Sequence, residues 1–363
     1  MNDTNEDHGG PAGDHQLLEL RHRIGQLDRE IVARAAERIS LAREVGEIKR
    51  QAARPIVDYA QERAVLDRAR EAAGEAGLDV PLAESLIVSL VRASVSAQDW
   101  DRVRRASVGA GKTAVVVGGE GRMGRWFVRF LADQGYTVGS LDVQASADEN
   151  AWAQAALATA DLIVSAAPPV ATAQIYDEWA SQPPRGVIAD IASIKTPLLA
   201  SIRRLQAAGA RVASLHPMFG PSVVLLRDCD VVICDTGDAD AAAEVTRLFA
   251  STTARLVYLP VAEHDRLMAD ALTLAHATAI AFALALPNAP TPLRSTTLGA
   301  LQSLAANVVR ESPDVYFEIQ ARNPHSREAL DRLRASVERL QHAIEHDSAA
   351  EFTALMEEGR AKT

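Results

Sequence analysis

The stretch LHPMFGPS, which begins at Leu215, places one histidine between apolar residues and beside two prolines. Pro217 and Pro221 fix the backbone angle φ and remove two backbone donors, so a helix is excluded here. We therefore expect His216 in a rigid turn, where its imidazole could exchange a proton near neutral pH. A histidine that only occupies the edge of a turn is the alternative.

A glycine-rich loop, GGEGRMG, follows the β-rich run TAVVV. Gly119, Gly121 and Gly124 fit the pattern G-x-G-x-x-G, which permits a tight turn, close approach of a pyrophosphate, and packing of helix on strand. The helix N-terminus then offers free N–H groups to the phosphates. An acid about 20 residues further on, Asp142, would bind the ribose hydroxyls and disfavour a 2′-phosphate, which favours NAD over NADP. The residues expected to bind NAD are Gly119, Gly121, Arg122, Met123, Gly124 and Asp142.

Two cations of the N-terminal segment share one face of a helix. At 100° per residue, Arg38 and Lys49 lie about 20° apart around the axis. Arg21 lies about 100° away from Arg38, so it cannot easily serve the same pocket from the same helix. A second copy of the chain could bring it there.

Acids and amides accompany these cations in the later helices. Asp58 and Glu62 are i,i+4 neighbours, and so are Ser94 and Gln98. Such a set suits a dianionic ligand that carries hydroxyl groups. A solvated, salt-bridged helical surface is the alternative.

The elements that must position these residues are helical at first. Apolar residues recur at spacings of 4, 3 and 4 from Leu20 to Ile31, which predicts one apolar stripe. The helix continues to about Lys49 and is too long to be stable alone, so it needs a partner helix or a partner chain. Pro55 ends it, a second helix follows, and Pro81 begins a third.

The whole chain divides into an all-α domain, an α/β domain and a second all-α domain. Strand-like runs (TAVVVGG, YTVGSLDV, DLIVSAAP, GVIADIAS) alternate with helical stretches, which predicts a doubly wound parallel sheet of the Rossmann type. The expected boundaries are a disordered tail at 1–13, helices at 14–105, a linker at 106–112, the nucleotide-binding sheet at 113–260 and helices at 261–363.

The composition of the chain argues against several classes of binding partner. A net charge of −10 argues against nucleic acid and acidic membranes. The apolar stretch from Ala271 to Leu286 is too short to span a bilayer and indicates a buried helix. Cys229 and Cys234 show no metal-binding spacing and are expected to be reduced. We expect a cytoplasmic protein without a metal site.

Several blocks resemble known families. Residues 17–98 resemble the all-helical chorismate mutase family through LLELRHRIGQLDREI, AERISLAREVGEIK and RPIVDYAQER. From Thr113 the chain resembles the prephenate dehydrogenase family through VVGGEGRMGRWF, DIASIK, LHPMFGP and EHDRLMA. Their order is similar to that of the bifunctional chorismate mutase–prephenate dehydrogenases of tyrosine biosynthesis.

The first resemblance implies a pericyclic rearrangement of chorismate to prephenate, which requires no acid, base or nucleophile. The site selects a folded conformer and stabilises negative charge on the ether oxygen. By this resemblance Arg38, Lys49 and Gln98 are catalytic, Arg21 comes from the second subunit, and Asp58, Glu62 and Ser94 bind the substrate.

The second resemblance implies NAD-dependent oxidative decarboxylation of prephenate to 4-hydroxyphenylpyruvate. His216 would accept the proton of the 4-hydroxyl group as hydride leaves for NAD, with Ser193 beside it. His276 would face the substrate pocket from the C-terminal helices, which in this family form a homodimer. Whether His264 is functional or structural stays open.

Three positions depart from these families. Gln61 stands where the mutase family usually has an arginine, and Ser222 stands where the dehydrogenase family usually has an acid. The arginine that clamps a substrate carboxylate is expected near Gly299, and the nearest one, Arg294, lies over a helical turn away. Loss of that clamp weakens prephenate binding unless another residue compensates.

A changed substrate is therefore an open alternative. A 4-ammonium group beside Asp58 and Glu62 would tolerate Gln61 better than an arginine, because like charges repel. Families that make 4-aminophenylpyruvate for antibiotic biosynthesis perform the same two steps on 4-amino-4-deoxychorismate and 4-amino-4-deoxyprephenate. We favour prephenate, on the frequency of the fused family.

A third alternative is a non-catalytic regulator that senses NAD or a metabolite. The joint presence of the following residues argues against it: Arg38, Lys49, Gln98, Ser193 and His216.

Overall fold

The computed structural model describes residues 11–52, 54, 58–223, 226–288, 293 and 295–362. The chain forms two compact units. The first contains the described residues up to Ala106 together with Val223–Arg227 and Ser251–Thr253, and the second contains Ser107–Ser222, Asp228–Ala250 and Ala254–Thr363. The tail to residue 10, Pro55 and Arg294 lie outside the described residues.

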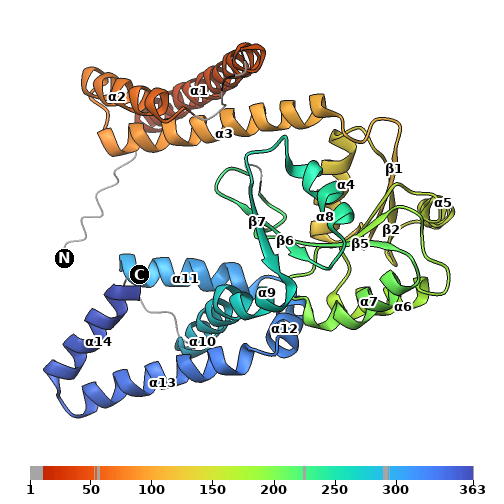
Figure 1. Cartoon of the computed structure of the whole chain (residues 1–363). Coiled ribbons are helices and arrows are strands. Elements are labelled where there is room, and N and C mark those ends of the chain that lie inside the picture. The colour runs from red at the N-terminus through yellow and green to blue at the C-terminus, as the bar shows by residue number, and fades with distance from the viewer. Residues whose placement is uncertain are drawn as a thin grey trace. The chain divides into compact units, whose positions relative to one another are not determined.

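Three helices form the body of the first unit: α1 (Pro11–Gln51), α2 (Tyr59–Ala76) and α3 (Val80–Ala106). Both α1 and α2 pack along α3 (Figure 1). The predicted apolar stripe of α1 is half or more exposed along its length, at Leu20, Ile24, Leu27 and Ile31. The first unit of one chain therefore leaves this stripe largely uncovered.

The second unit is built on a seven-stranded sheet of order β2-β1-β3-β4-β5-β6-β7. Its strands are β1 (Thr113–Val117), β2 (Thr137–Leu141), β3 (Leu162–Ser165), β4 (Val187–Asp190), β5 (Arg211–Pro217), β6 (Asp230–Asp235) and β7 (Arg255–Pro260). The predicted parallel pairing is confirmed for β1 to β5 and for β6 with β7. It is wrong for β5 with β6, which are antiparallel. A parallel neighbour needs a crossover, usually a helix, and the described residues between β5 and β6 form none.

Helices cover both faces of the sheet, as a doubly wound fold requires. They are α4 (Arg122–Asp133), α5 (Ala147–Leu157), α6 (Pro169–Trp179), the 3₁₀ turn Thr196–Leu198 with α7 (Leu199–Ala207), and α8 (Ala239–Phe249). On one face α4 meets α8, where the rings of Phe130 and Phe249 stack at 5.0 Å. On the other face Leu157, Tyr176 and Leu205 pack in one core with strand residues such as Ile163.

The C-terminal part of the second unit is helical. It contains α9 (Val261–Met268), a π-helical segment (Ala269–Leu274), α10 (Ala275–Ala285), α11 (Thr296–Val309), α12 (Pro313–Arg322), α13 (Ser326–Glu345) and α14 (Ala349–Lys362). β7 runs directly into α9 at Pro260. The helix predicted at Ala271–Leu286 is longer than expected, because Val261–Ala285 is continuous, and the prediction that it is buried is wrong, because few of its residues are buried in one chain. By length and composition alone, this segment and α3 could each cross a membrane.

The close packing of α4 on β1 gives a test of the fold. A Cβ at Gly124 would lie 2.0 Å from the carbonyl oxygen of Gly118, so backbone must move. We expect Gly124→Ala to lower the free energy of unfolding by about 1–3 kcal/mol in urea titrations. The matched control is Gly299→Ala, at an open position on α11. It should be stabilising by roughly 0.5–1 kcal/mol, and equal losses in both variants would contradict this packing.

Candidate functional site

The glycine loop joins β1 to α4, and its glycines allow neighbouring protein atoms to approach the loop backbone closely. Gly118 has φ +76°, and a Cβ there would lie 2.8 Å from the backbone nitrogen of Ala167. Gly121 caps α4 without a side-chain hydrogen bond, so the first-turn N–H groups have no side-chain acceptor from the cap. Gly118 was missed by the sequence pattern, although it precedes the three predicted glycines directly. The loop is suited to a pyrophosphate.

Asp142 lies beside this loop at the end of β2. Its Oδ2 accepts a hydrogen bond from the backbone of Glu120 (3.1 Å), and its Oδ1 accepts one from Gln144 (2.9 Å). The hydroxyl of Ser140 donates to the Glu120 carboxylate (2.8 Å), so two carboxylates lie on this edge. The structure thus brings Asp142 together with the predicted loop residues Gly119, Gly121, Arg122, Met123 and Gly124. The side chain of Arg122 forms an ion pair with Glu311, which follows α11.

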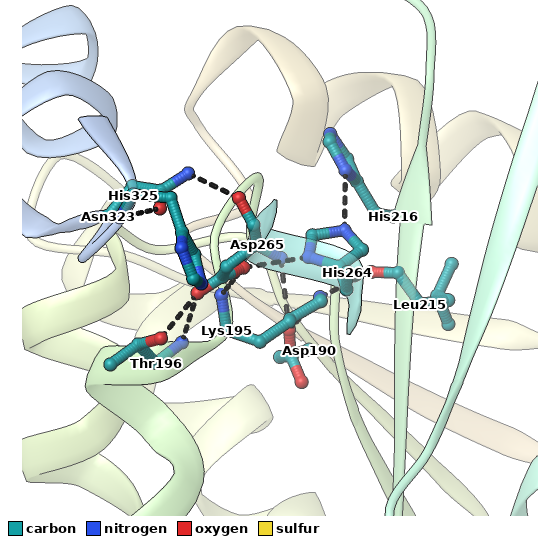
Figure 2. A network of polar contacts seen from close by, with 10 residues as sticks. Asp190, Lys195, Thr196, Leu215, His216, His264, Asp265, Asn323 and His325 are labelled. Atoms are coloured by element: carbon teal, nitrogen blue, oxygen red, sulfur yellow. Dashed lines mark hydrogen bonds and ion pairs between the residues drawn. The ribbon is translucent and has the colours of Figure 1, made fainter. Parts of the chain in front are cut away.

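His216 is almost fully buried (4 % exposed) and lies near the end of β5. The predicted rigid turn is wrong, because both His216 and Pro217 pair with β6. A proline is tolerated at a strand end, where one missing donor costs little. Nδ1 of His216 lies 3.0 Å from Nε2 of His264, and Nδ1 of His264 lies 2.8 Å from Oδ1 of Asp265 (Figure 2).

The carboxylate of Asp265 is the centre of this network. It accepts hydrogen bonds from the backbone of Lys195 (2.8 Å), the backbone of Thr196 (2.7 Å) and the hydroxyl of Thr196 (2.6 Å). Burial alone would raise the pKa of Asp265, but the hydrogen bonds from His264, Thr196 and Lys195 lower it to about 2. Relative to 3.8, this contributes about 2 kcal/mol of stability, present above pH 3.8 and lost as pH falls toward 2.

Lys195 is fully buried and ties two strands together. Its Nζ donates to Oδ1 of Asp190 at the end of β4 (2.6 Å) and to the carbonyl of Leu215 on β5 (2.9 Å). Asn323, after α12, donates to the carbonyl of Asp265 (2.7 Å). The backbone on both sides of the histidine pair is therefore held by buried polar contacts (Figure 2).

Both histidines are held in their neutral form. Burial lowers the pKa of His216 well below 6.5, and the nearby His264 and Lys195 lower it further while Asp265 opposes them. Burial also lowers the pKa of His264, although its hydrogen bond to Asp265 acts in the opposite direction. A neutral imidazole carries one donor and one acceptor nitrogen, so one ring of this pair can donate a hydrogen bond to the other.

Ser193 and His276 lie on neighbouring elements. Ser193 is half-buried in the loop after β4, two residues before Lys195, and so lies at the same sheet edge as the end of β5. The ring of His276 packs 4.4 Å from that of Tyr316, and burial lowers the pKa of His276. In an uninterrupted α-helix His264 and His276 would point about 120° apart. A π-helix rotates less per residue than an α-helix, so the π-helical segment between them reduces this angle.

The first unit brings a second polar set together between α1 and α3. Arg38 donates to Oγ of Ser94 (2.8 Å) and to the carbonyl of Leu90 (3.1 Å). Nε2 of Gln98 donates to the carbonyl of Ala42 (2.5 Å). A Cβ at Gly46 would lie 2.8 Å from Cγ of Gln98, so this glycine makes room for the amide. Burial lowers the pKa of Arg38.

The remaining predicted residues of this set lie at the start of α2 and on α1. Lys49 lies 3.9 Å from the carboxylate of Asp58, which also caps α2 through the backbone of Gln61 (3.0 Å). Glu62 accepts two hydrogen bonds from Arg227 of the same unit (2.6 and 3.1 Å), a partner that sequence patterns did not predict. Arg21 is exposed on α1 and is not brought to the set within one chain.

Each unit contains a segment that matches a known protein family. Residues 20–99 match the type II chorismate mutase model, and residues 132–258 match the nucleotide-binding domain of prephenate dehydrogenase. The T-protein of Enterobacter agglomerans is 29% identical over 85% of this chain and 80% of its own length. A 4-amino-4-deoxyprephenate dehydrogenase of Streptomyces pristinaespiralis is 32% identical over 68% of this chain and 89% of its own length.

The chain belongs to the prephenate dehydrogenase family. With its type II chorismate mutase domain, it is an isomerase joined to an oxidoreductase, as the sequence predicted.

Solved structures share the fold of the dehydrogenase part. Prephenate dehydrogenase from A. aeolicus, in complex with hydroxyphenyl propionate and NAD+, has a TM-score of 0.55 at 18% identity. The match covers 69% of this chain and 96% of that one. Synechocystis arogenate dehydrogenase has a TM-score of 0.53 at 16% identity, covering 69% and 98% of the two chains. At these identities the likeness establishes the fold.

The buried pair of Lys195 and Asp190 gives a test of the site's architecture. Lys195→Met leaves the Asp190 charge uncompensated in the core, so we expect a loss of about 3–5 kcal/mol in the free energy of unfolding. The control is the double variant Lys195→Met with Asp190→Asn, which removes both charges and keeps an acceptor for the backbone of Ala192. Denaturant titration should show the double variant to be the more stable. A single variant as stable as the parent would contradict the buried pair.

Proposed function

We propose that the first unit rearranges chorismate to prephenate and that the second unit oxidises and decarboxylates prephenate to 4-hydroxyphenylpyruvate with NAD. The observation that carries this proposal is the buried, neutral His216 at the end of β5, hydrogen-bonded through His264 to Asp265. The T-protein match across 85% of the chain supports both steps in one protein. We also expect the protein to be cytoplasmic.

For the mutase step, the α1–α3 set supplies charge and hydrogen bonds rather than acid or base. Arg38 and Lys49 would hold a carboxylate and the ether oxygen, and Gln98 would be the second donor to that oxygen. Their partly buried positions strengthen such contacts with charge that develops in the transition state. Asp58, Glu62 and Ser94 would bind the ring hydroxyl and the carboxylates; for Glu62 this requires a shared or exchanged contact with Arg227.

For the dehydrogenase step, His216 would accept the proton of the 4-hydroxyl group. NAD held at the glycine loop would supply the acceptor for the hydride that leaves the ring carbon bearing this hydroxyl. Ser193 would hydrogen-bond beside His216, and His276 would line the substrate pocket from α10. Loss of CO2 makes the ring aromatic, which drives the step forward.

The glycine loop fits the dinucleotide. The first turn of α4 has no side-chain cap and can offer its N–H groups to a pyrophosphate, while Gly119 and Gly124 allow the close packing that shapes the loop. The carboxylates of Asp142 and Glu120 would repel a 2′-phosphate, which supports NAD rather than NADP.

A homodimer would cover apolar surface that one chain leaves exposed. The stripe Leu20–Ile31 on α1 and residues such as Phe317 and Ile344 in the C-terminal helices are half or more exposed. Exposed apolar surface on helices is often covered at subunit interfaces. A partner's α1 would also bring Arg21 toward the α1–α3 set of this chain.

A second candidate substrate is 4-amino-4-deoxyprephenate. The relative from S. pristinaespiralis and the three departures Gln61, Ser222 and Gly299 keep it as the alternative. A 4-ammonium group would suit the missing arginine at Gln61. We place prephenate first because the T-protein match extends over the mutase unit as well.

The deciding experiment measures NADH production by the purified protein with prephenate and with 4-amino-4-deoxyprephenate at matched concentrations. We expect kcat/KM to be higher on prephenate by about tenfold or more, since one charge-assisted contact is worth roughly 1.5–3 kcal/mol. A preference for the amine would contradict this and identify the second candidate. No NADH from either substrate would refute both.

The double change Ser222→Asp with Gly299→Arg probes the cause of the preference. Both positions are exposed, and nothing lies within 4 Å of a Cβ at Gly299, so the new side chains can be accommodated. If the amine is the substrate, the double change should raise turnover of prephenate.

A further inference from the structure

We propose that Asp265 and His264 fix the tautomer of His216, which makes His264 a positioning residue for the nitrogen that accepts the substrate proton. This inference rests on the proposed function, in which His216 is the proton acceptor. It concerns the second unit alone, and each hydrogen-bond direction follows from the groups present. The directions are assigned starting from Asp265, whose ionised carboxylate can accept hydrogen bonds but cannot donate them.

The carboxylate of Asp265 is the acceptor at the end of this row of hydrogen bonds. Its Oδ2 accepts from the backbone and hydroxyl of Thr196, and its Oδ1 accepts from the backbone of Lys195. An ionised carboxylate has only acceptors, so the contact of 2.8 Å with His264 requires a proton on Nδ1 of His264. A proton on Asp265 instead would have to replace one of these donors.

The next two directions follow. With Nδ1 protonated, a neutral His264 presents Nε2 as an acceptor. Nδ1 of His216 lies 3.0 Å from this nitrogen and must donate to it. The ring of His216 then carries its only proton on Nδ1, so Nε2 keeps a free lone pair. The opposite tautomer would put a proton on Nε2 of His216 and leave the ring unable to act as a base through that atom.

The charged groups around the pair favour this arrangement. Nζ of Lys195 is engaged by Asp190 and by the carbonyl of Leu215, so it does not compete with His264 for Asp265. Counting Asp190, Lys195 and Asp265 as ionised, the cluster carries one net negative charge before reaction. A proton taken up by His216 brings the cluster to neutrality; Asp265 favours that charged form, whereas burial, His264 and Lys195 oppose it and keep the resting ring neutral.

Lys195 fixes the spacing of the two rings, because it binds the backbone or side chain next to each of them. Lys195 binds Asp265 of α9 through its backbone N–H and binds Leu215 of β5 through its side chain. The residues bound are the direct neighbours of His264 and His216. The ring centroids lie 5.2 Å apart with planes inclined at 62°, which keeps the rings edge to face.

Two variants separate positioning from simple packing. His264→Gln keeps an acceptor and a donor on one planar group, separated about as far as the two ring nitrogens, and can preserve both contacts. His264→Leu removes both. We expect His264→Leu to lower the dehydrogenase kcat by about 100-fold or more, as loss of a tautomer-fixing partner does in other enzymes, and His264→Gln to recover most of it. Chorismate rearrangement by the first unit should not change in either variant.

The direct readout is a long-range ¹H–¹⁵N NMR spectrum of the full-length protein with ¹⁵N-labelled histidine, without substrate. We expect a protonated Nδ1 and an unprotonated Nε2 on His216 in the parent and in His264→Gln, and a mixture or the reverse in His264→Leu. An Nε2-protonated His216 in the parent, or equal kcat in the parent and His264→Leu, would overturn the proposal. The predicted tautomer without turnover of either substrate would refute the proposed function and leave the positioning intact.

Discussion

The buried carboxylate of Asp265 is the constraint on which the dehydrogenase site depends. A carboxylate in a protein interior is costly unless hydrogen bonds replace its water. Here the loop after β4 supplies three of these bonds and His264 supplies the fourth. Because three of the donors come from the loop after β4 and the carboxylate lies on α9, satisfying this one charge joins the edge of the sheet to the C-terminal helices.

The topology of the sheet makes that junction possible. β4 and β5 are parallel neighbours, so the loop that carries Lys195 and the strand end that carries His216 lie at the same edge. The antiparallel return through β6 and β7 then brings the chain directly into α9 at Pro260. The site is thus assembled from three segments far apart in sequence, and buried Lys195 contacts all three.

The α1–α3 set depends on a simpler constraint, which is the packing of two long helices. Arg38 and Gly46 lie on the face of α1 that meets α3, where Ser94 and Gln98 approach them. Helical periodicity alone predicted that Arg38 and Lys49 share a face of α1, but not that this face meets α3. Arg21 was predicted to lie off this face, and it is exposed within one chain.

Local patterns were predictable, and long-range polar partners were not. The glycine loop and Asp142 follow from short spacings on one βαβ unit, and the structure places them together. The partnership of Lys195 with Asp265 spans 70 residues and leaves no periodic trace. The π-helical segment and the antiparallel β5–β6 pair were also missed, since neither has a compositional signature. The turn predicted at His216 failed because strand pairing with β6 outweighs the local effect of Pro217.

The central claim, that Asp265 is a fixed anion orienting the histidine pair, is tested most directly by its own titration. The ¹³C shift of the Asp265 carboxyl would be followed against pH, with the signal assigned by its absence from Asp265→Asn. The account predicts an ionised carboxylate at every pH at which the fold persists, with a pKa of about 2. A titration midpoint at or above 3.8 in the folded protein would contradict it.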